Sequence, residues 1–144
     1  MPNAYYLYSA SRWLYLHHVP ILPKLIMLLI FLVYNCKIPY QANIGKGTKF
    51  GIGGMGVGIH PKAVIGENCF IAMHVTIGGG NMLYPGVPTI GNHVVIAKGA
   101  VIVGGITIGD NAFIGANSVV SKPVPANAIV SCTPAKVIGY RDDE

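Results

Sequence analysis

Charged side chains are scarce in this sequence: Asp, Glu, Lys and Arg make up 10% of its 144 residues, whereas apolar residues make up 52%. This balance excludes intrinsic disorder, which requires the opposite, and a coiled coil, which is rich in Glu and Lys. The ten basic residues give a net charge of +5, but no two of them are adjacent. Such diffuse charge argues against nucleic-acid binding and favours a small anionic partner such as a phosphorylated cofactor.

Cysteine is also scarce. Cys36, Cys69 and Cys132 are odd in number and lack the spacing of a metal site. We therefore expect free thiols, no bound metal and a reducing, cytoplasmic compartment. A secretory leader is not expected, because basic residues followed by a small-residue cleavage site are missing.

Residues 1–37 differ in composition from the rest and predict a helical segment. Ser9 is expected to cap a short helix through His18, and Pro23 to begin a second helix that reaches about Asn35. The second helix would span roughly 18 Å, short of the ~30 Å that a bilayer core requires. Two interpretations stay open: the helices pack on the main domain or a neighbouring subunit, or the aromatic and leucine side chains of residues 5–35 make peripheral contact with a membrane.

From Ile38 onward the informative signal is a period of six. Aliphatic residues recur at this spacing at Ile59, Ile65, Ile71 and Ile77, and again at Ile90, Ile96, Ile102, Ile108, Ile114 and Val120. Most are followed by Gly or Ala, and another small or apolar residue comes four positions after each. An internal repeat takes precedence over other signals when a fold is read from sequence.

Six residues suit one short strand and one corner, so three units form a triangular coil. Each coil would stack on the last at ~4.8 Å, with the aliphatic residue pointing inward and the Gly or Ala beside it allowing the bend. We therefore predict an all-β main domain over residues 38–125, a parallel β-helix of about four coils, followed by an extension over residues 126–144. A prism with few charges is expected to bury one face in a homotrimer, which creates three equivalent clefts.

Several stretches resemble the left-handed hexapeptide acyltransferases: Ile44-Gly45-Lys46-Gly47, Ile65-Gly66-Glu67-Asn68, Val75-Thr76-Ile77-Gly78-Gly79 and the run over residues 108–120. Val124-Pro125-Ala126-Asn127 and the later Pro134-Ala135-Lys136-Val137-Ile138-Gly139 look like the C-terminal end of their serine acetyltransferase branch. Residues 13–24 look like those of short members placed in surface-polysaccharide pathways. The resemblance implies a left-handed coil and an acetyl-CoA-dependent acetyltransferase.

The sequence departs from the serine acetyltransferase pattern at two places. That branch carries an aspartate just before Ile-His-Pro, and a histidine after an aspartate on the following coil. Here Lys37 precedes Ile38-Pro39-Tyr40, and Gly51 to Gly53 stand at the second place. A related group with a glycine-rich sequence there keeps Ile-His-Pro, as in Ile59-His60-Pro61.

The repeat breaks twice. Phe50 and Ile59 are nine residues apart, and most of the segment between them, Gly51 to Gly58, is glycine. It is no phosphate loop, because no Lys-Ser/Thr ends it and no helix follows; it is either a bulged coil or bare backbone on which a ligand lies. The thirteen residues from Ile77 to Ile90 predict a loop at about 80–89 that projects from the prism. In the related families such a loop closes over the acceptor beside a neighbouring subunit.

Acyl transfer needs a base for the acceptor's proton and donors for the oxyanion, and histidine is the usual base. His60 occupies a position where the repeat expects a small residue, and His74 lies just ahead of the predicted loop. Both are candidate catalytic residues, whereas His93 is expected to be solvated. Eighteen-residue coils put His60 and His74 on different parts of the perimeter, so they would meet only across an interface. Glu67 is a candidate to orient a histidine.

Small side chains predict where a cofactor would lie. The resemblance places the pantetheine arm of acetyl-CoA along Ala97, Gly99, Gly115 and Ala116, with Ser131 and Lys136 near the nucleotide. Lys98 and Lys122 are candidate phosphate contacts, or else solvated surface charges. No Cys or Ser has the setting of a nucleophile.

These observations favour an acetyl-CoA-dependent O- or N-acetyltransferase acting on a sugar or other small polar acceptor by direct transfer. Serine O-acetyltransferase is the alternative within the same class. A zinc lyase would need paired histidines five apart, and His74 and His93 are 19 apart. A non-catalytic structural or partner subunit stays open, because the Asp–His pair is missing.

Overall fold

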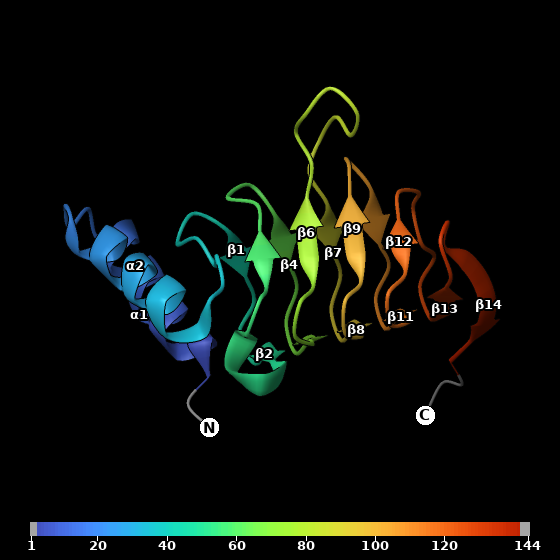
Figure 1. The fold of residues 1–144 in the computed structure, drawn as a ribbon, viewed down its shortest axis with the longest axis horizontal. Helices are drawn as coiled ribbons and strands as arrows, with labels where there is room; N and C mark the ends of the chain where they lie inside the picture. The colour runs from blue at the N-terminus through green and yellow to red at the C-terminus, as the bar shows by residue number, and fades with distance from the viewer. Residues whose placement is uncertain (1–2, 142–144) are drawn as a thin grey trace.

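The computed structural model describes residues 3–141, which form two helices followed by a β-solenoid (Figure 1). Helix α1 spans Ala4–Leu16 and helix α2 spans Leu22–Tyr34. The side chain of Asn3 caps α1 by accepting a hydrogen bond from the Tyr5 amide at 3.1 Å. The helix therefore starts five residues before the predicted cap at Ser9, which was wrong.

Three sheets form the faces of the solenoid. The first contains β1 (Asn43–Ile44), β4 (Val64–Ile65), β7 (Thr89–Ile90) and β10 (Thr107–Ile108). The second contains β2 (Lys49–Phe50), β5 (Phe70–Ile71), β8 (Val95–Ile96), β11 (Phe113–Ile114), β13 (Ala128–Ser131) and β14 (Lys136–Tyr140). The third contains β3 (Gly58–Ile59), β6 (Thr76–Gly78), β9 (Val101–Val103) and β12 (Val119–Val120).

From β1 to β12, successive strands belong to the three sheets in turn, so the chain winds as a triangular coil. Strands within a sheet pair in parallel, except that β14 runs antiparallel to β13. The winding is left-handed (Figure 1). The predicted left-handed parallel β-helix is therefore confirmed, with the N-terminal helices at one end and β14 at the other.

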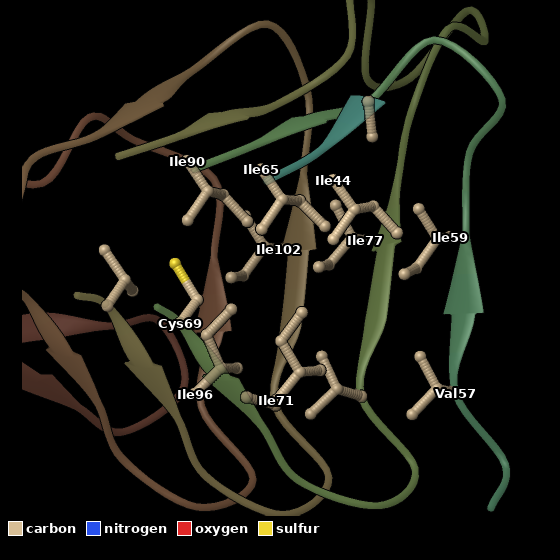
Figure 2. Close-up of a cluster of buried hydrophobic side chains, with 14 of the residues drawn as sticks. Ile44, Val57, Ile59, Ile65, Cys69, Ile71, Ile77, Ile90, Ile96 and Ile102 are labelled. Carbon is tan, nitrogen blue, oxygen red and sulfur yellow. The ribbon is translucent and has the colours of Figure 1, made fainter. Parts of the chain in front are cut away.

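Stacked aliphatic side chains fill the prism, as the period of six predicts. Parallel pairing puts equivalent residues in register, for example Ile59 beside Ile77 and Ile77 beside Ile102. Figure 2 shows these side chains pointing into the space between the sheets. Ile71, Ile96 and Ile102 are fully buried. Each such residue typically contributes about 1.5–3 kcal/mol on burial, so the repeat itself supplies the core.

The three edges of the prism are named here by the sheets that they join. The 1–2 edge follows strands of the first sheet, the 2–3 edge follows strands of the second, and the 3–1 edge follows strands of the third. At the 1–2 and 2–3 edges the fourth residue of the hexad adopts a left-handed backbone. The non-glycine residues in this position include Asn68, His74, His93, Asn111 and Asn117, with φ between 55° and 61°. Asn and His tolerate this conformation better than most residues.

Helix α1 seals the first coil through side-chain hydrogen bonds. The Tyr8 hydroxyl donates to the Ala42 carbonyl at 2.5 Å and accepts from the Ile44 amide at 3.0 Å. The Arg12 guanidinium donates to the carbonyls of Tyr40, Gln41 and Ala42. These bonds satisfy backbone groups that no earlier coil can reach. Within residues 3–141, neither helix is long and apolar enough to pass through a bilayer.

Candidate active site

The predicted site residues separate onto two edges of the prism. The 2–3 edge carries His74 and the row of small residues, which includes Ala97, Lys98, Gly99, Gly115, Ala116 and Ser131. The 3–1 edge carries His60, the long loop and Lys122. One chain therefore does not bring the two histidines together, in agreement with the coil arithmetic.

Small residues along the 2–3 edge are hydrogen-bonded to the neighbouring coils. The amides of Ala97 and Gly115 donate to the Ile114 and Val130 carbonyls at 2.9 and 2.8 Å, and the Gly99 amide donates to Met73 at 3.1 Å. These amides are therefore not free to bind a pantetheine arm.

The residues between them offer the free donors on this edge. Within residues 3–141, the backbone amides of Lys98 and Ala116 donate a hydrogen bond to no backbone carbonyl. A ligand lying along the edge would therefore bond to the amides of Lys98 and Ala116, and the small residues beside them would let it approach.

His74 lies on this same edge. A backbone hydrogen bond fixes its position, and its ring occupies a gap in the preceding coil. Its amide donates to the Met55 carbonyl at 2.9 Å. The Nδ1 side of the ring lies over Gly56, where a Cβ would overlap the imidazole. The glycine-rich segment, which contains the short 3-10 helix η1 (Gly51–Gly54), thus makes room for His74. It is a bulged coil with a function that the sequence did not reveal.

His60 lies at the 3–1 edge with its tautomer defined by a hydrogen bond. The Lys62 amide donates to Nδ1 of His60 at 3.0 Å. A neutral imidazole that accepts at Nδ1 carries its proton on Nε2, so Nε2 of His60 is a donor. This nitrogen faces Gly80, where a Cβ would lie 3.3 Å away. His60 is therefore suited to donate a hydrogen bond and unsuited to take a proton at Nε2.

The loop between β6 and β7 projects above the third sheet (Figure 1). Its base is closed by the Gly80 amide, which donates to the carbonyls of Tyr84 and Gly86 at 2.9 and 2.7 Å. Its tip is the most exposed apolar part of the solenoid, since Met82 is 96% exposed. A loop with a firm base and an apolar tip can reach a neighbouring surface.

Lys122 and Lys136 meet at one hollow near the C-terminal end. It is lined by Val120, Ser121, Lys122, Pro123, Val124, Val130, Pro134, Ala135, Lys136 and Val137. Two lysines that are 14 residues apart in the sequence thus share a concave site, which suits the phosphates of a nucleotide. Lys98 lies on the 2–3 edge, apart from this pair.

Neither candidate histidine has an acidic partner among residues 3–141. Glu67 stands on the 1–2 edge, where its carbonyl accepts from the His93 amide at 2.9 Å. Within one chain Glu67 therefore lies on a different edge from His60 and His74, and its role in orienting a histidine stays a prediction. In the same described range, no three His, Cys, Asp or Glu side chains gather closely enough to hold a metal ion.

The two buried thiols, Cys36 and Cys69, are expected to be unreactive near neutral pH. Burial raises the pKa of Cys36 to about 11, and burial is also the main cause that raises the pKa of Cys69. Both stay protonated near neutral pH, where a thiol is a poor nucleophile. Neither buried thiol is therefore a candidate nucleophile.

Comparison with known proteins gives a consistent result. Residues 88–122 match the family described as bacterial transferase hexapeptide (six repeats). The serine acetyltransferase of Synechococcus elongatus is 39% identical over 135 residues, which cover 93% of this chain and 54% of that protein. The chain thus spans about half the length of the curated relatives that it matches.

Solved structures agree with the sequence match. A serine acetyltransferase in complex with CoA superposes with a TM-score of 0.84 at 31% identity, covering 94% of this chain and 55% of the other. A soybean serine acetyltransferase complexed with serine gives a TM-score of 0.85 at 35% identity, covering 94% and 56%. The similarity extends over both helices and the solenoid.

Proposed function

We propose, on the basis of its hexapeptide repeat and its similarity to serine acetyltransferases, that this chain transfers an acetyl group from acetyl-CoA to a small polar acceptor. The observation that carries the proposal is the 2–3 edge. There a histidine, two free backbone amides and a row of small residues stand in line on successive coils. An extended pantetheine arm needs such a shallow, unobstructed edge with donors along it.

The proposed reaction is direct transfer. The acceptor's hydroxyl or amine attacks the thioester carbonyl carbon while His74 takes its proton. The tetrahedral intermediate then collapses, the C–S bond breaks, and the thiolate of CoA leaves with the proton from His74. Base catalysis of this kind contributes typically about 10²–10⁴-fold.

His60 is proposed to act as a donor rather than as a second base. Its Nε2–H would stabilise the oxyanion or hold the acceptor, as the tautomer requires. Because His60 and His74 lie on different edges, the complete site needs the 3–1 edge of one copy beside the 2–3 edge of another. A homotrimer would supply three such sites.

Serine is the first acceptor to test, because the similar proteins are serine acetyltransferases and the soybean one is complexed with serine. A sugar is the second candidate. It is favoured by Lys37 and Gly51 to Gly53, which stand where that branch carries its aspartate and its Asp–His motif. The phosphates of the donor would lie at Lys122 and Lys136.

The test is thiol release from acetyl-CoA by the purified protein with a panel containing serine and several sugars. Release with serine alone assigns the first acceptor, and release with a sugar alone assigns the second. The proposal is overturned if no acceptor gives release and the protein shows no affinity for CoA by calorimetry. That result would favour the non-catalytic structural or partner subunit.

A further inference from the structure

Helix α2 presents an apolar face that no residue of the described chain covers. Its inner side buries Pro23, Ile30 and Tyr34. On its outer side four leucines recur at helical spacing and are between 46% and 69% exposed: Leu25, Leu28, Leu29 and Leu32. Phe31 and Val33 extend the exposed surface on either flank. A contiguous apolar face of this kind usually marks an interaction site.

The half of the chain that contains this face carries charge of one sign. Residues 1–66 contain six basic residues and no acidic one, so their formal charge is +6, whereas the remaining residues contain four basic and five acidic ones. The diffuse charge of the whole chain thus hides an asymmetry between its two halves. A partner that covers α2 must therefore be apolar inside and anionic at its surface.

A hollow beside α2 combines both properties. Its floor is formed by Met27, Leu28, Phe31 and Cys36, and Lys24 and Lys37 stand at it from the helix and from the start of the solenoid. Both lysines are exposed. An apolar floor with two ammonium groups suits an acyl chain whose headgroup is a phosphate.

Aromatic side chains lie on the adjoining helix. Trp13 is 59% exposed and stacks on the His17 ring with 4.0 Å between centroids. Tyr6 is exposed farther along the same helix. Trp and Tyr favour the boundary between water and lipid, because each ring combines an apolar body with a polar group.

From these observations we infer that the α1–α2 hairpin docks the protein on the surface of an anionic lipid bilayer. The leucines of α2 enter the boundary of the acyl chains, and Lys24 and Lys37 lie at the level of the phosphates. Helix α2 has 13 residues, about 20 Å at 1.5 Å per residue, so it lies on the bilayer and does not cross it. A second copy packed through α2 against this same face fits less well, because it would bring its own Lys24 and Lys37 toward those of the first copy.

The experiment uses the full chain and two kinds of vesicle. One kind contains phosphatidylcholine alone, and in the other roughly 30 to 40% of the lipid is anionic phosphatidylglycerol. Trp13 is the single tryptophan, so its emission reports on the hairpin directly. We expect co-sedimentation with the anionic vesicles, a blue shift of the emission, and quenching by brominated lipid. Acetyl-CoA is left out, so the result does not depend on the proposed enzymatic activity.

The decisive variant replaces three exposed leucines: Leu25→Gln, Leu28→Gln and Leu32→Gln. The matched control replaces three exposed apolar residues elsewhere: Met82→Gln, Leu83→Gln and Ile138→Gln. The first variant should lose at least tenfold in vesicle affinity and the control should bind like the wild type. Lys24→Gln and Lys37→Gln should each weaken binding to the anionic vesicles about fivefold.

Two outcomes overturn the inference. The first is a wild-type protein that does not bind anionic vesicles, and the second is a leucine variant that binds them as the wild type does. If the first is found and the leucine variant also has a lower molar mass by light scattering, the face is assigned to contact with another copy. Circular dichroism of each variant shows whether the helices and solenoid remain folded.

Discussion

The imidazole of His74 occupies the space that a side chain at Gly56 would fill. The two residues face each other on neighbouring coils of the 2–3 edge, and Gly56 has a φ of 69°, which other residues rarely adopt. Two residues farther along, Gly58 has no atom within 4 Å of the place where its Cβ would stand. The glycine-rich segment therefore contains one glycine on which His74 depends and one that is replaceable.

We expect Gly56→Ala to displace His74 and to lower acetyl transfer at least tenfold. The methyl group would collide with the ring, and the left-handed backbone adds a cost of about 1 kcal/mol or more in stability. Gly58→Ala is the matched control and should leave both activity and the unfolding midpoint close to those of the wild type. Equal activity of the two variants would show that the position of His74 does not matter for transfer.

The two histidines should respond differently to conservative replacement. His74→Asn keeps a residue that tolerates the left-handed backbone, so it should fold normally yet lose about 10²–10⁴-fold in kcat, as removal of a general base does. His60→Gln keeps a side-chain N–H donor and should retain most of the activity, whereas His60→Ala should not. Initial rates of thiol release, with CoA affinity as a control, measure both. A His60→Gln variant as inactive as His60→Ala would argue against the donor role.

Removal of two buried hydroxyl groups, those of Ser118 and Thr48, should change the free energy of unfolding in opposite directions. Ser118 is fully buried, and within residues 3–141 its hydroxyl has no hydrogen-bond partner. Thr48 is equally buried, but its hydroxyl donates to the Gly66 carbonyl at 2.9 Å and accepts from the Cys69 amide at 3.2 Å. Ser118→Ala should therefore stabilise the protein by about 1 kcal/mol, and Thr48→Ala should destabilise it by about 1–3 kcal/mol. Urea unfolding of both variants checks the signs, and a loss of stability in Ser118→Ala would contradict the prediction.

Thiol reactivity should single out one cysteine. Cys132 is exposed, whereas Cys36 and Cys69 are buried. At pH 8 a limiting maleimide should modify Cys132 rapidly and the buried thiols only on unfolding. Mass spectrometry after brief labelling measures this, and Cys132→Ser should remove the fast reaction.

Because the pKa of Cys36 is raised in the folded chain, the free energy of unfolding should fall as the pH rises into the alkaline range. Folding raises this pKa from 9.0 to about 11, so the folded chain holds a proton that the unfolded chain has lost in that range. The contribution is complete below about pH 9 and is lost as the pH rises to about 11. Replacing the thiol in Cys36→Ala should flatten the decline of unfolding free energy across this interval.

Much of the fold could be predicted because a six-residue period encodes it directly. Ile96, Ile102 and Ile108 could be placed inside the prism from spacing alone, and they are fully buried. The separation of His60 from His74 also followed from the length of one coil. These properties depend on the backbone path, which the repeat specifies.

The parts that sequence reasoning missed depend on contacts that no period encodes. Ser9 and Asn3 are both good capping residues, and the helix starts at Ala4 because Tyr5 and Tyr8 must reach the backbone of the first coil. The Lys62 amide that determines the tautomer of His60 is turned by the local bend. One property of the site could have been predicted from the repeat. His74 stands in the same hexad position as Gly99 and Asn117, and all three adopt a positive φ, so its left-handed backbone follows from its place in the repeat.

A stack of identical coils has no natural limit, since each coil is a template for the next. The Tyr8 and Arg12 hydrogen bonds occupy backbone groups at one end of this stack, and the reversed strand β14 covers the last parallel strand of the second sheet at the other. An antiparallel last strand offers a second molecule no parallel template on that sheet, which opposes end-to-end polymerisation into fibrils.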